Sequence, residues 1–187
     1  MADVIVIGDG PGGLSAALLL AKNGMDVVVF GEDKTAMHAA LLKNYLGIPE
    51  MTGTDFQVVA RKQARDHGAS LREARVESVR KDGDRYAASL EGGDAVTGRY
   101  LILSEGKGPR LANELGLGLD HDEAQGVPTD KNGLTKLAGV YVVGRSARPG
   151  RSQAIISAGD GAAAAIDILS REKGEDVADW DTPPQDG

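Results

Sequence analysis

The sequence predicts an α/β fold, in which a parallel β-sheet is covered by helices and accompanied by a small antiparallel β-meander. Four short apolar runs carry this prediction, because each is continuous rather than alternating, as in strands that are buried on both faces. These runs are residues 4–7, 27–30, 100–103 and 140–143. Helical segments separate several of them, and strand–helix–strand order joins strands in parallel through right-handed crossovers.

The composition of the chain excludes several kinds of functional site and partner. The chain has 187 residues, a net charge of −7 and 41% hydrophobic residues. This length suits one domain, and the acidic balance argues against nucleic-acid binding, because phosphate backbones would be repelled. Cysteine is absent, which excludes disulfides, thiolate metal sites and an internal redox dithiol. We expect no metal site, no membrane span, since no apolar run reaches about 18 residues, and a cytoplasmic location, since no signal peptide is visible.

The first two helices have clear start and stop signals. One spans residues 14–22 and ends at Asn23 and Gly24, which have the C-cap role. The other begins after Thr54 as N-cap and ends at Gly68. Its apolar stripe is predicted to consist of Phe56, Val59, Ala60 and Ala64.

The remaining elements follow from turn signals and composition. The meander is predicted from strands 71–79, 86–90 and 95–97, with turns at 81–84 and 92–94. Residues 111–115 can form a short helix, and residues 153–169 form a long alanine-rich one. Residues 174–187, which are rich in acids, are interpreted as a mobile tail.

The segment Gly8-Asp9-Gly10-Pro11-Gly12-Gly13 is a G-x-G-x-x-G that directly follows a buried strand and opens a helix. This is the setting of a Rossmann dinucleotide-binding loop, in which glycines permit a tight turn and a close approach of backbone to pyrophosphate. The helix N-terminus then faces the phosphates with free N–H groups. We therefore predict a dinucleotide site at Gly8, Gly10, Pro11, Gly12 and Gly13; the alternative is a tight turn without a ligand.

An acidic residue about 20 positions further on is expected to bind the ribose. We assign Glu32, although Gly31 separates it from the strand, and a solvated loop acid is the alternative. No arginine stands beside it in the sequence, which argues against a 2′-phosphate. Residues 159–164 match the loose pattern G-x-G-x-x-A, but they lie inside a predicted helix with no preceding strand, so we interpret this match as a false positive.

Four stretches of the chain have, in order, the motifs of one flavoprotein family. They are residues 4–17, Asn44-Tyr45-Leu46-Gly47-Ile48 with Thr52-Gly53 after it, residues 100–106, and residues 139–144 with 153–161 after them. They resemble the FAD-binding domain of the thioredoxin reductase-like group of pyridine nucleotide–disulfide oxidoreductases. The resemblance implies a single Rossmann-like FAD/NAD(P)-binding domain over residues 1–172. Its segments are 1–106 and 125–171, joined by a bridge over 107–124 and followed by a flexible acidic tail, 173–187.

The resemblance also implies FAD as the cofactor and adds residues to its site. The added residues are His38, Asn44, Gly106, Gly144, Arg145, Gln153 and Ala154. Asn44 is expected to reach the flavin ring system. The helix that starts at Gln153 is expected to point at the pyrimidine edge, where its N-terminus stabilises the charge of reduction. His38 is expected beside the isoalloxazine; the alternative is a packed or half-exposed loop residue.

The chain departs from the family pattern at several points. The bridge 107–124 stands where the family has an NADPH-binding domain, and the family's C-x-x-C is absent. Arg145 replaces an Asp that accepts a hydrogen bond from the ribityl chain; because Arg cannot accept one, we expect it to pair with phosphate oxygens. Ser104-Glu105 replaces Ala-Thr, and Leu46 replaces a Pro.

Three functions remain open at this point. The first is a minimal FAD-dependent oxidoreductase without a redox disulfide, reduced by NAD(P)H or by a protein, with no catalytic residue assigned. The second is a non-enzymatic flavin- or nucleotide-binding module or an electron-transfer subunit. The third is an NAD-binding Rossmann protein, which rests on fold analogy. The resemblance further implies a homodimer.

Overall fold

The computed structural model describes residues 1–118 and 126–183. Its α-helices are α1 (Pro11–Lys22), α2 (Gly53–Asp66), α3 (Arg110–Glu114) and α4 (Ala154–Lys173). Its strands are β1 (Ala2–Ile7), β2 (Val27–Phe30), β3 (Leu41–Leu42), β4 (Met51–Thr52), β5 (Ser70–Arg72), β6 (Val76–Asp82), β7 (Arg85–Leu90), β8 (Ala95–Leu103) and β9 (Val140–Val142). Short 3-10 helices are η1 (Ala36–Ala39), η2 (Gly144–Ser146) and η3 (Pro149–Arg151).

The main sheet has the strand order β5-β2-β1-β8-β7-β6, and β9 also pairs with β8. Strands β2, β1, β8 and β9 run parallel, as the continuous apolar runs predict. Strand β8 also serves the meander, since residues 95–98 pair antiparallel with β7. The prediction of two strands, 95–97 and 100–103, is therefore wrong. Glycine is favoured at position 98 of this strand, because a Cβ there would lie 2.8 Å from Cγ1 of Ile5 on β1.

The predicted strand 71–79 is in fact two strands. β5 pairs in parallel with β2, whereas β6 pairs antiparallel with β7, and residues 73–75 separate them. β5 and β6 occupy the two ends of the strand order. Because three extended residues span only about 11 Å, the sheet must curl until these two ends approach each other.

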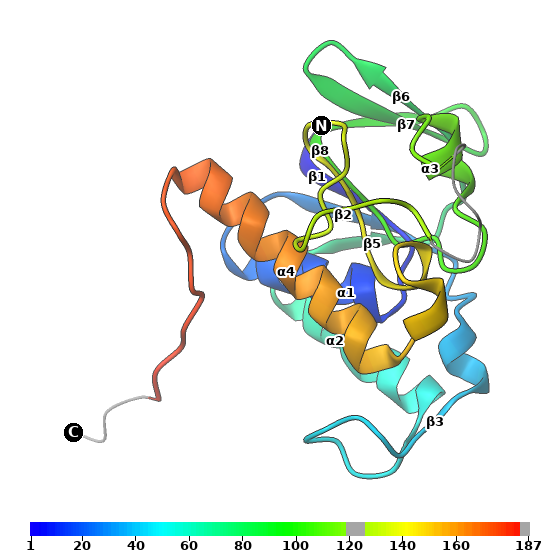
Figure 1. Ribbon diagram of the computed structural model, residues 1–187, viewed down its shortest axis with the longest axis vertical. Coiled ribbons are helices and arrows are strands. Elements are labelled where there is room, and N and C mark those ends of the chain that lie inside the picture. Colours follow the sequence, from blue (N-terminus) through cyan, green and yellow to red (C-terminus); the bar gives the residue numbers. More distant parts are fainter. Residues whose placement is uncertain (119–125, 184–187) are drawn as a thin grey trace.

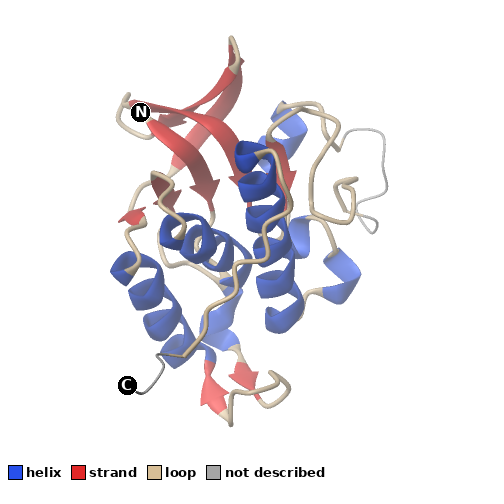
Figure 2. Ribbon diagram, turned by 90° about the vertical axis from the view of Figure 1, so that its left-hand side faces the viewer, coloured by secondary structure: helices blue, strands red, loops and turns tan. Residues whose placement is uncertain are grey.

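Apolar side chains fill both faces of the parallel strands. On one face, Val4, Val6, Ile102 and Tyr141 pack against α1 and α4. On the other face, Ile5, Ile7, Leu101 and Leu103 pack against the meander and against Leu111 of α3. Figure 2 shows α1, α2 and α4 together on one side of the sheet.

Helices α1 and α4 cross closely, with α2 on the far side of α1 (Figure 1). A Cβ at Gly161 of α4 would overlap the carbonyl oxygen of Gly12 in α1. This contact explains Gly161 but not Gly159, where a Cβ would meet open space; both glycines lie inside α4, as predicted.

Helix α2 differs from the prediction at its start and on its buried face. It begins at Gly53, and its N-cap is Thr52, whose Oγ1 accepts a hydrogen bond of 3.1 Å from Asp55 N. Val59, assigned to the apolar stripe, is 49% exposed, whereas Gln57 and Arg61 are buried. Of the predicted stripe, Ala64 is buried in the core and Ala60 packs against that core, so only Val59 is wrong; the periodicity missed the polar residues Gln57 and Arg61 on the same buried side.

The last described residues pack on the helices. Val177 N donates a hydrogen bond of 3.0 Å to Ser170 Oγ, and Lys22 Nζ lies 3.0 Å from Asp179 Oδ1. The division into a domain over 1–172 and a flexible tail stays a prediction. In the described part of the chain, every helix is too short or too polar to cross a bilayer.

Candidate functional site

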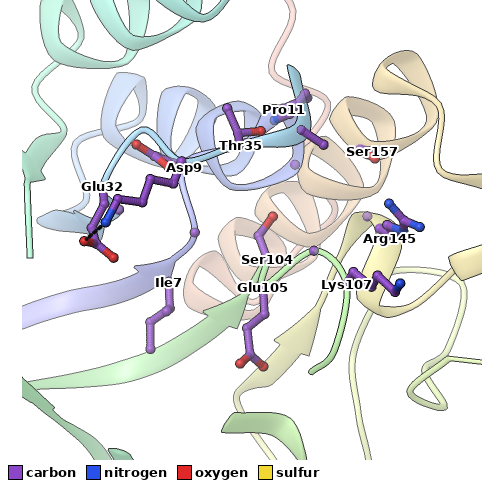
Figure 3. Close-up of a pocket in the computed structure, with 18 of the residues that line it drawn as sticks. Ile7, Asp9, Pro11, Glu32, Thr35, Ser104, Glu105, Lys107, Arg145 and Ser157 are labelled. Atoms are coloured by element: carbon purple, nitrogen blue, oxygen red, sulfur yellow. Dashed lines mark hydrogen bonds and ion pairs between the residues drawn. The ribbon is translucent and has the colours of Figure 1, made fainter. Parts of the chain in front are cut away.

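A cavity of about 560 Å³ lies at the carboxyl ends of the parallel strands, between the N-termini of α1 and α4 (Figure 3). It begins where β1 ends at Ile7, and Ser104 after β8 and Gly144 after β9 also line it. Glu32, beyond β2, lines one end, and Arg145 and Lys107 line the other. This is the edge at which open α/β sheets bind ligands.

The glycines of the phosphate loop serve two different purposes. Gly8 has φ +101°, and a Cβ there would overlap the Ser104 carbonyl oxygen. A Cβ at Gly13 would overlap the Gly8 carbonyl oxygen, so both glycines are required by the protein itself. Gly10 has φ −77°, and a Cβ there would meet only Thr35 Oγ1 at 3.5 Å. Because Gly10 lines the cavity, its missing side chain leaves room for a ligand.

Two helix N-termini converge on the cavity. The N-cap residues are Gly10 for α1, which has no side chain, and Gln153 for α4, whose side chain does not cap the helix. Pro11 and Gly12 of α1 and Ala154 and Ser157 of α4 line the cavity. The free N–H groups and positive dipole ends of both helices therefore favour negative charge in the space between them.

At the other side of the phosphate loop, Glu32 is half-exposed and binds Lys34, with 2.7 Å between Oε1 and Nζ. This hydrogen bond lowers the pKa of Glu32. The fold also brings Arg75, from the link between β5 and β6, to the same end of the cavity. No arginine is adjacent to Glu32 in the sequence, but the folded protein places Arg75 near it.

The structure brings Asn44 and Gln153 together, and Asn44 Nδ2 donates a hydrogen bond of 2.9 Å to Gln153 Oε1. Neither residue lines the cavity, but Ser152 and Ala154, on either side of Gln153, do. His38 lies elsewhere: its ring nitrogens contact Thr54 Oγ1 at 3.0 Å and the Asp33 carbonyl oxygen at 2.8 Å, outside the cavity lining. Its contact with a flavin ring stays a prediction.

Sequence comparison assigns the family. The sequence model described as "Pyridine nucleotide-disulphide oxidoreductase" matches residues 41–162, about two thirds of the chain. The chain belongs to this family. Residues 1–42 match a second sequence model, described as "FAD binding domain", and FAD is accordingly the cofactor of this oxidoreductase fold.

The sequence of this family member is similar to those of several thioredoxin reductases. One from Claviceps purpurea (strain 20.1) is 31% identical over 109 residues, which are 56% of this chain and 34% of the relative. A bifunctional thioredoxin reductase/thioredoxin from Mycobacterium leprae (strain TN) is 35% identical over 114 residues, which are 58% of this chain and 24% of the relative. The chain thus spans only about a quarter to a third of the length of these relatives.

Solved structures show the same fold. The thioredoxin reductase from Gloeobacter violaceus superposes with a TM-score of 0.82 at 20% identity, covering 96% of this chain and 99% of that one. The atypical thioredoxin reductase TRi from Desulfovibrio vulgaris Hildenborough gives 0.79 at 18% identity, covering 94% and 99%. At these identities the likeness concerns the fold alone.

One departure from the pyridine nucleotide-disulphide oxidoreductase pattern has a structural reason. The Glu105 carboxylate accepts hydrogen bonds from Leu111 N at 2.8 Å and Ala112 N at 3.1 Å. Glu105 therefore caps the N-terminus of α3, which lies within the predicted bridge 107–124. Burial raises the pKa of Glu105 despite these two hydrogen bonds. Ser104, by contrast, faces the phosphate loop, with Oγ 3.3 Å from a Cβ at Gly12.

The other departure changes the charge of the site. Arg145 follows Gly144, whose φ of +67° forms the turn after β9, and both residues line the cavity. Lys107, directly after Gly106, lines the same end. Within residues 1–118 and 126–183, neither cation forms an ion pair. Sequence reasoning missed Lys107, although its place directly after the predicted Gly106 could have indicated it.

Sequence reasoning also missed Asp9, Gln57 and Arg61, which meet beneath the phosphate loop. Arg61 ion-pairs with Asp9, and Gln57 Nε2 donates a hydrogen bond of 2.9 Å to the Asp9 carbonyl oxygen. The signal available in the sequence was the pair Gln57 and Arg61, two polar residues four positions apart on α2. The valines beside Gln57, Val58 and Val59, are exposed in the structure. Only the position of α2 against the loop makes that pattern meaningful.

Proposed function

We propose that this chain binds FAD in the cavity between α1 and α4 and uses the flavin for electron transfer without a redox disulfide of its own. The observation that carries the proposal is the convergence of two uncapped helix N-termini on one cavity, with Gly10 leaving room at the first of them. FAD has a diphosphate that the N-terminus of α1 can bind. It also has a flavin ring, which gains negative charge on reduction and which the N-terminus of α4 can stabilise.

Each predicted residue except His38, which lies outside the cavity lining, then has a place along the cofactor. Gly8, Gly10, Pro11, Gly12 and Gly13 form the diphosphate cradle, and Glu32 binds the adenosine ribose. Gly106, Gly144 and Arg145 lie between the two helix ends, where Arg145 would pair with phosphate oxygens. Ala154 and the α4 N–H groups face the pyrimidine edge of the ring, and Asn44 and Gln153, which do not line the cavity, position this helix end. Bound FAD supplies the electron chemistry, and these residues bind and orient it.

The reductant is proposed to be NAD(P)H or an electron-donating protein, because residues 1–118 and 126–183 contain a single phosphate loop that follows a strand and opens a helix. We further propose a homodimer, as the resemblance to the thioredoxin reductase-like group suggests, and a cytoplasmic location.

A second candidate is a non-enzymatic flavin-binding module or electron-transfer subunit. It is favoured by the cavity lining, which contains neither histidine nor cysteine among the described residues. Such a lining offers carboxylates, lysine, arginines and hydroxyls, but no group that exchanges protons readily near neutral pH.

One experiment separates these candidates. The protein is purified, its absorbance spectrum recorded, and any released cofactor identified. A flavin spectrum with FAD released supports the binding proposal, whereas colourless protein that takes up no FAD on titration contradicts it. Anaerobic mixing with NADH or NADPH, followed by an electron acceptor, then tests catalysis. Sustained turnover supports the oxidoreductase, stable FAD binding without turnover supports the module, and release of NAD in place of FAD would contradict both.

A further inference from the structure

A buried ion pair lies directly beneath the phosphate loop. Asp9 is the second residue of that loop and is 5% exposed, and Arg61 of α2, which pairs with it, is 7% exposed. A carboxylate inside a diphosphate-binding loop is unfavourable for the ligand, because two negative charges a few ångströms apart repel each other most strongly where water is excluded. The negative charge of Asp9 must therefore be compensated if the loop is to bind a diphosphate.

The groups around Asp9 provide this compensation. Its carboxylate accepts a hydrogen bond of 3.1 Å from Asp33 N, in addition to the Arg61 pair. Fully buried Gln57 donates from Nε2 to the Asp9 carbonyl oxygen at 2.9 Å and to Asp33 Oδ1 at 3.3 Å. A Cβ at Gly31 would overlap the Asp9 carboxylate. The side chain thus occupies space that the turn after β2 leaves free for it.

Arg61 has three acidic neighbours, but only one of them is buried. Asp33 Oδ1 lies 3.8 Å from Nη1, and its side chain is 39% exposed. Glu73 Oε1 lies 3.4 Å from Nη2, and its side chain is 74% exposed. Water can solvate both of these acids, whereas Asp9 depends on Arg61 for compensation of its charge.

We propose that Arg61 is a positioning residue for diphosphate binding, which neutralises Asp9 and holds its carboxylate toward α2. The loop then presents backbone N–H groups, without opposing charge, to the phosphates. This inference rests on the proposed dinucleotide site. Asp9 lines the cavity, whereas Arg61 does not and acts only through Asp9.

The test compares a charged and an uncharged ligand of the same half-site. ADP and adenosine are titrated calorimetrically into wild type, Arg61→Gln, Arg61→Lys and the double variant Asp9→Asn/Arg61→Gln, with folding checked by circular dichroism. We expect Arg61→Gln to weaken ADP binding by at least about tenfold and to leave adenosine binding unchanged. Arg61→Lys keeps the charge and should stay within about threefold of wild type. In the double variant, which removes the unpaired carboxylate, ADP affinity should return to within about threefold.

The rescue separates this role from a structural one. Loss of packing would weaken adenosine as well as ADP and would persist in the double variant, and either result overturns the proposal. If Arg61→Gln does not fold, Asp9→Asn alone decides: removal of the acid should leave ADP affinity unchanged or raise it, and a tenfold loss overturns the proposal. Wild-type protein that binds neither ADP nor FAD would instead refute the dinucleotide site itself.

Discussion

Asn44 and Gln153 lie 109 positions apart in the chain, yet Asn44 Nδ2 and Gln153 Oε1 are 2.9 Å apart in the structure. Gln153 is the N-cap residue of α4, and its side chain does not cap that helix. The hydrogen bond therefore links the loop between β3 and β4 to the helix end that faces the cavity. Asn44 is placed to set the position of this end of the proposed flavin site without lining the cavity itself.

Replacement of Asn44 by Ala should weaken FAD binding by about fivefold, which corresponds to the net free energy of one hydrogen bond of about 1 kcal/mol. Binding of ADP should not change, because ADP lacks the flavin half. Fluorescence titration with FAD and calorimetry with ADP measure both affinities. Gln63→Ala, at an exposed position of α2, is the matched control. An equal loss for both ligands would show that Asn44 acts on the whole fold.

Two glycines of the phosphate loop should respond in opposite ways to replacement by Ala. Gly8→Ala should unfold the protein or cost several kcal/mol, because φ is +101° and the new Cβ overlaps the Ser104 carbonyl. Gly10→Ala should change the free energy of unfolding by at most about 1 kcal/mol, as for an N-cap substitution. It should nevertheless reduce FAD affinity by tenfold or more, because its Cβ enters the cavity. Urea unfolding and FAD titration give the two quantities, and full FAD affinity in Gly10→Ala would contradict the assigned site.

The two glycines of α4 offer a comparison within one helix. Gly161→Ala should destabilise the protein by several kcal/mol, because the added methyl group overlaps the Gly12 carbonyl and must push α1 and α4 apart. Gly159→Ala meets open space and should stabilise by about 0.5–1 kcal/mol, since alanine loses less backbone entropy in a helix. Equilibrium urea unfolding measures both changes. Similar effects at the two positions would mean that the helices do not approach closely at Gly161.

Stability should fall at alkaline pH because of Tyr100. Burial, together with the hydrogen bond of 2.8 Å that its hydroxyl donates to Glu172, raises the pKa of Tyr100 to about 12 from its ordinary value of 10.0. Between these values the unfolded chain loses a proton that the folded chain keeps, so the free energy of unfolding decreases as pH rises from about 10 to about 12. Below pH 10 this contribution is fully present.

The measurement is the free energy of unfolding against pH in wild type and in Tyr100→Phe. The variant should lose part of the alkaline slope, because phenylalanine has no proton to release. Tyr45→Phe is the control, since the Tyr45 hydroxyl forms no hydrogen bond within residues 1–118 and 126–183. Identical slopes in wild type and Tyr100→Phe would refute the assignment.

The sequence by itself determined the parallel strands, the phosphate loop and the family. Apolar runs such as residues 27–30 are local patterns, because a strand that is buried on both faces requires apolar side chains at every position. The Gly8–Gly13 loop is equally local, because the strand before it and the helix after it are neighbours in the chain. The resemblance likewise rested on short motifs in order, and Gly161 could be recognised as a helical glycine from its context alone.

Tertiary structure decided everything that depends on which segments meet. The residues that separate β5 from β6 look continuous in sequence, but the two strands pair at opposite ends of a curled sheet. Val59 fits an apolar stripe, yet α2 turns Gln57 and Arg61 inward, because Gln57 donates a hydrogen bond to the Asp9 carbonyl oxygen and Arg61 pairs with the buried Asp9 carboxylate. Likewise Arg75 and Glu32 line the same end of the cavity although they are far apart in the chain, and local sequence patterns do not encode such an arrangement.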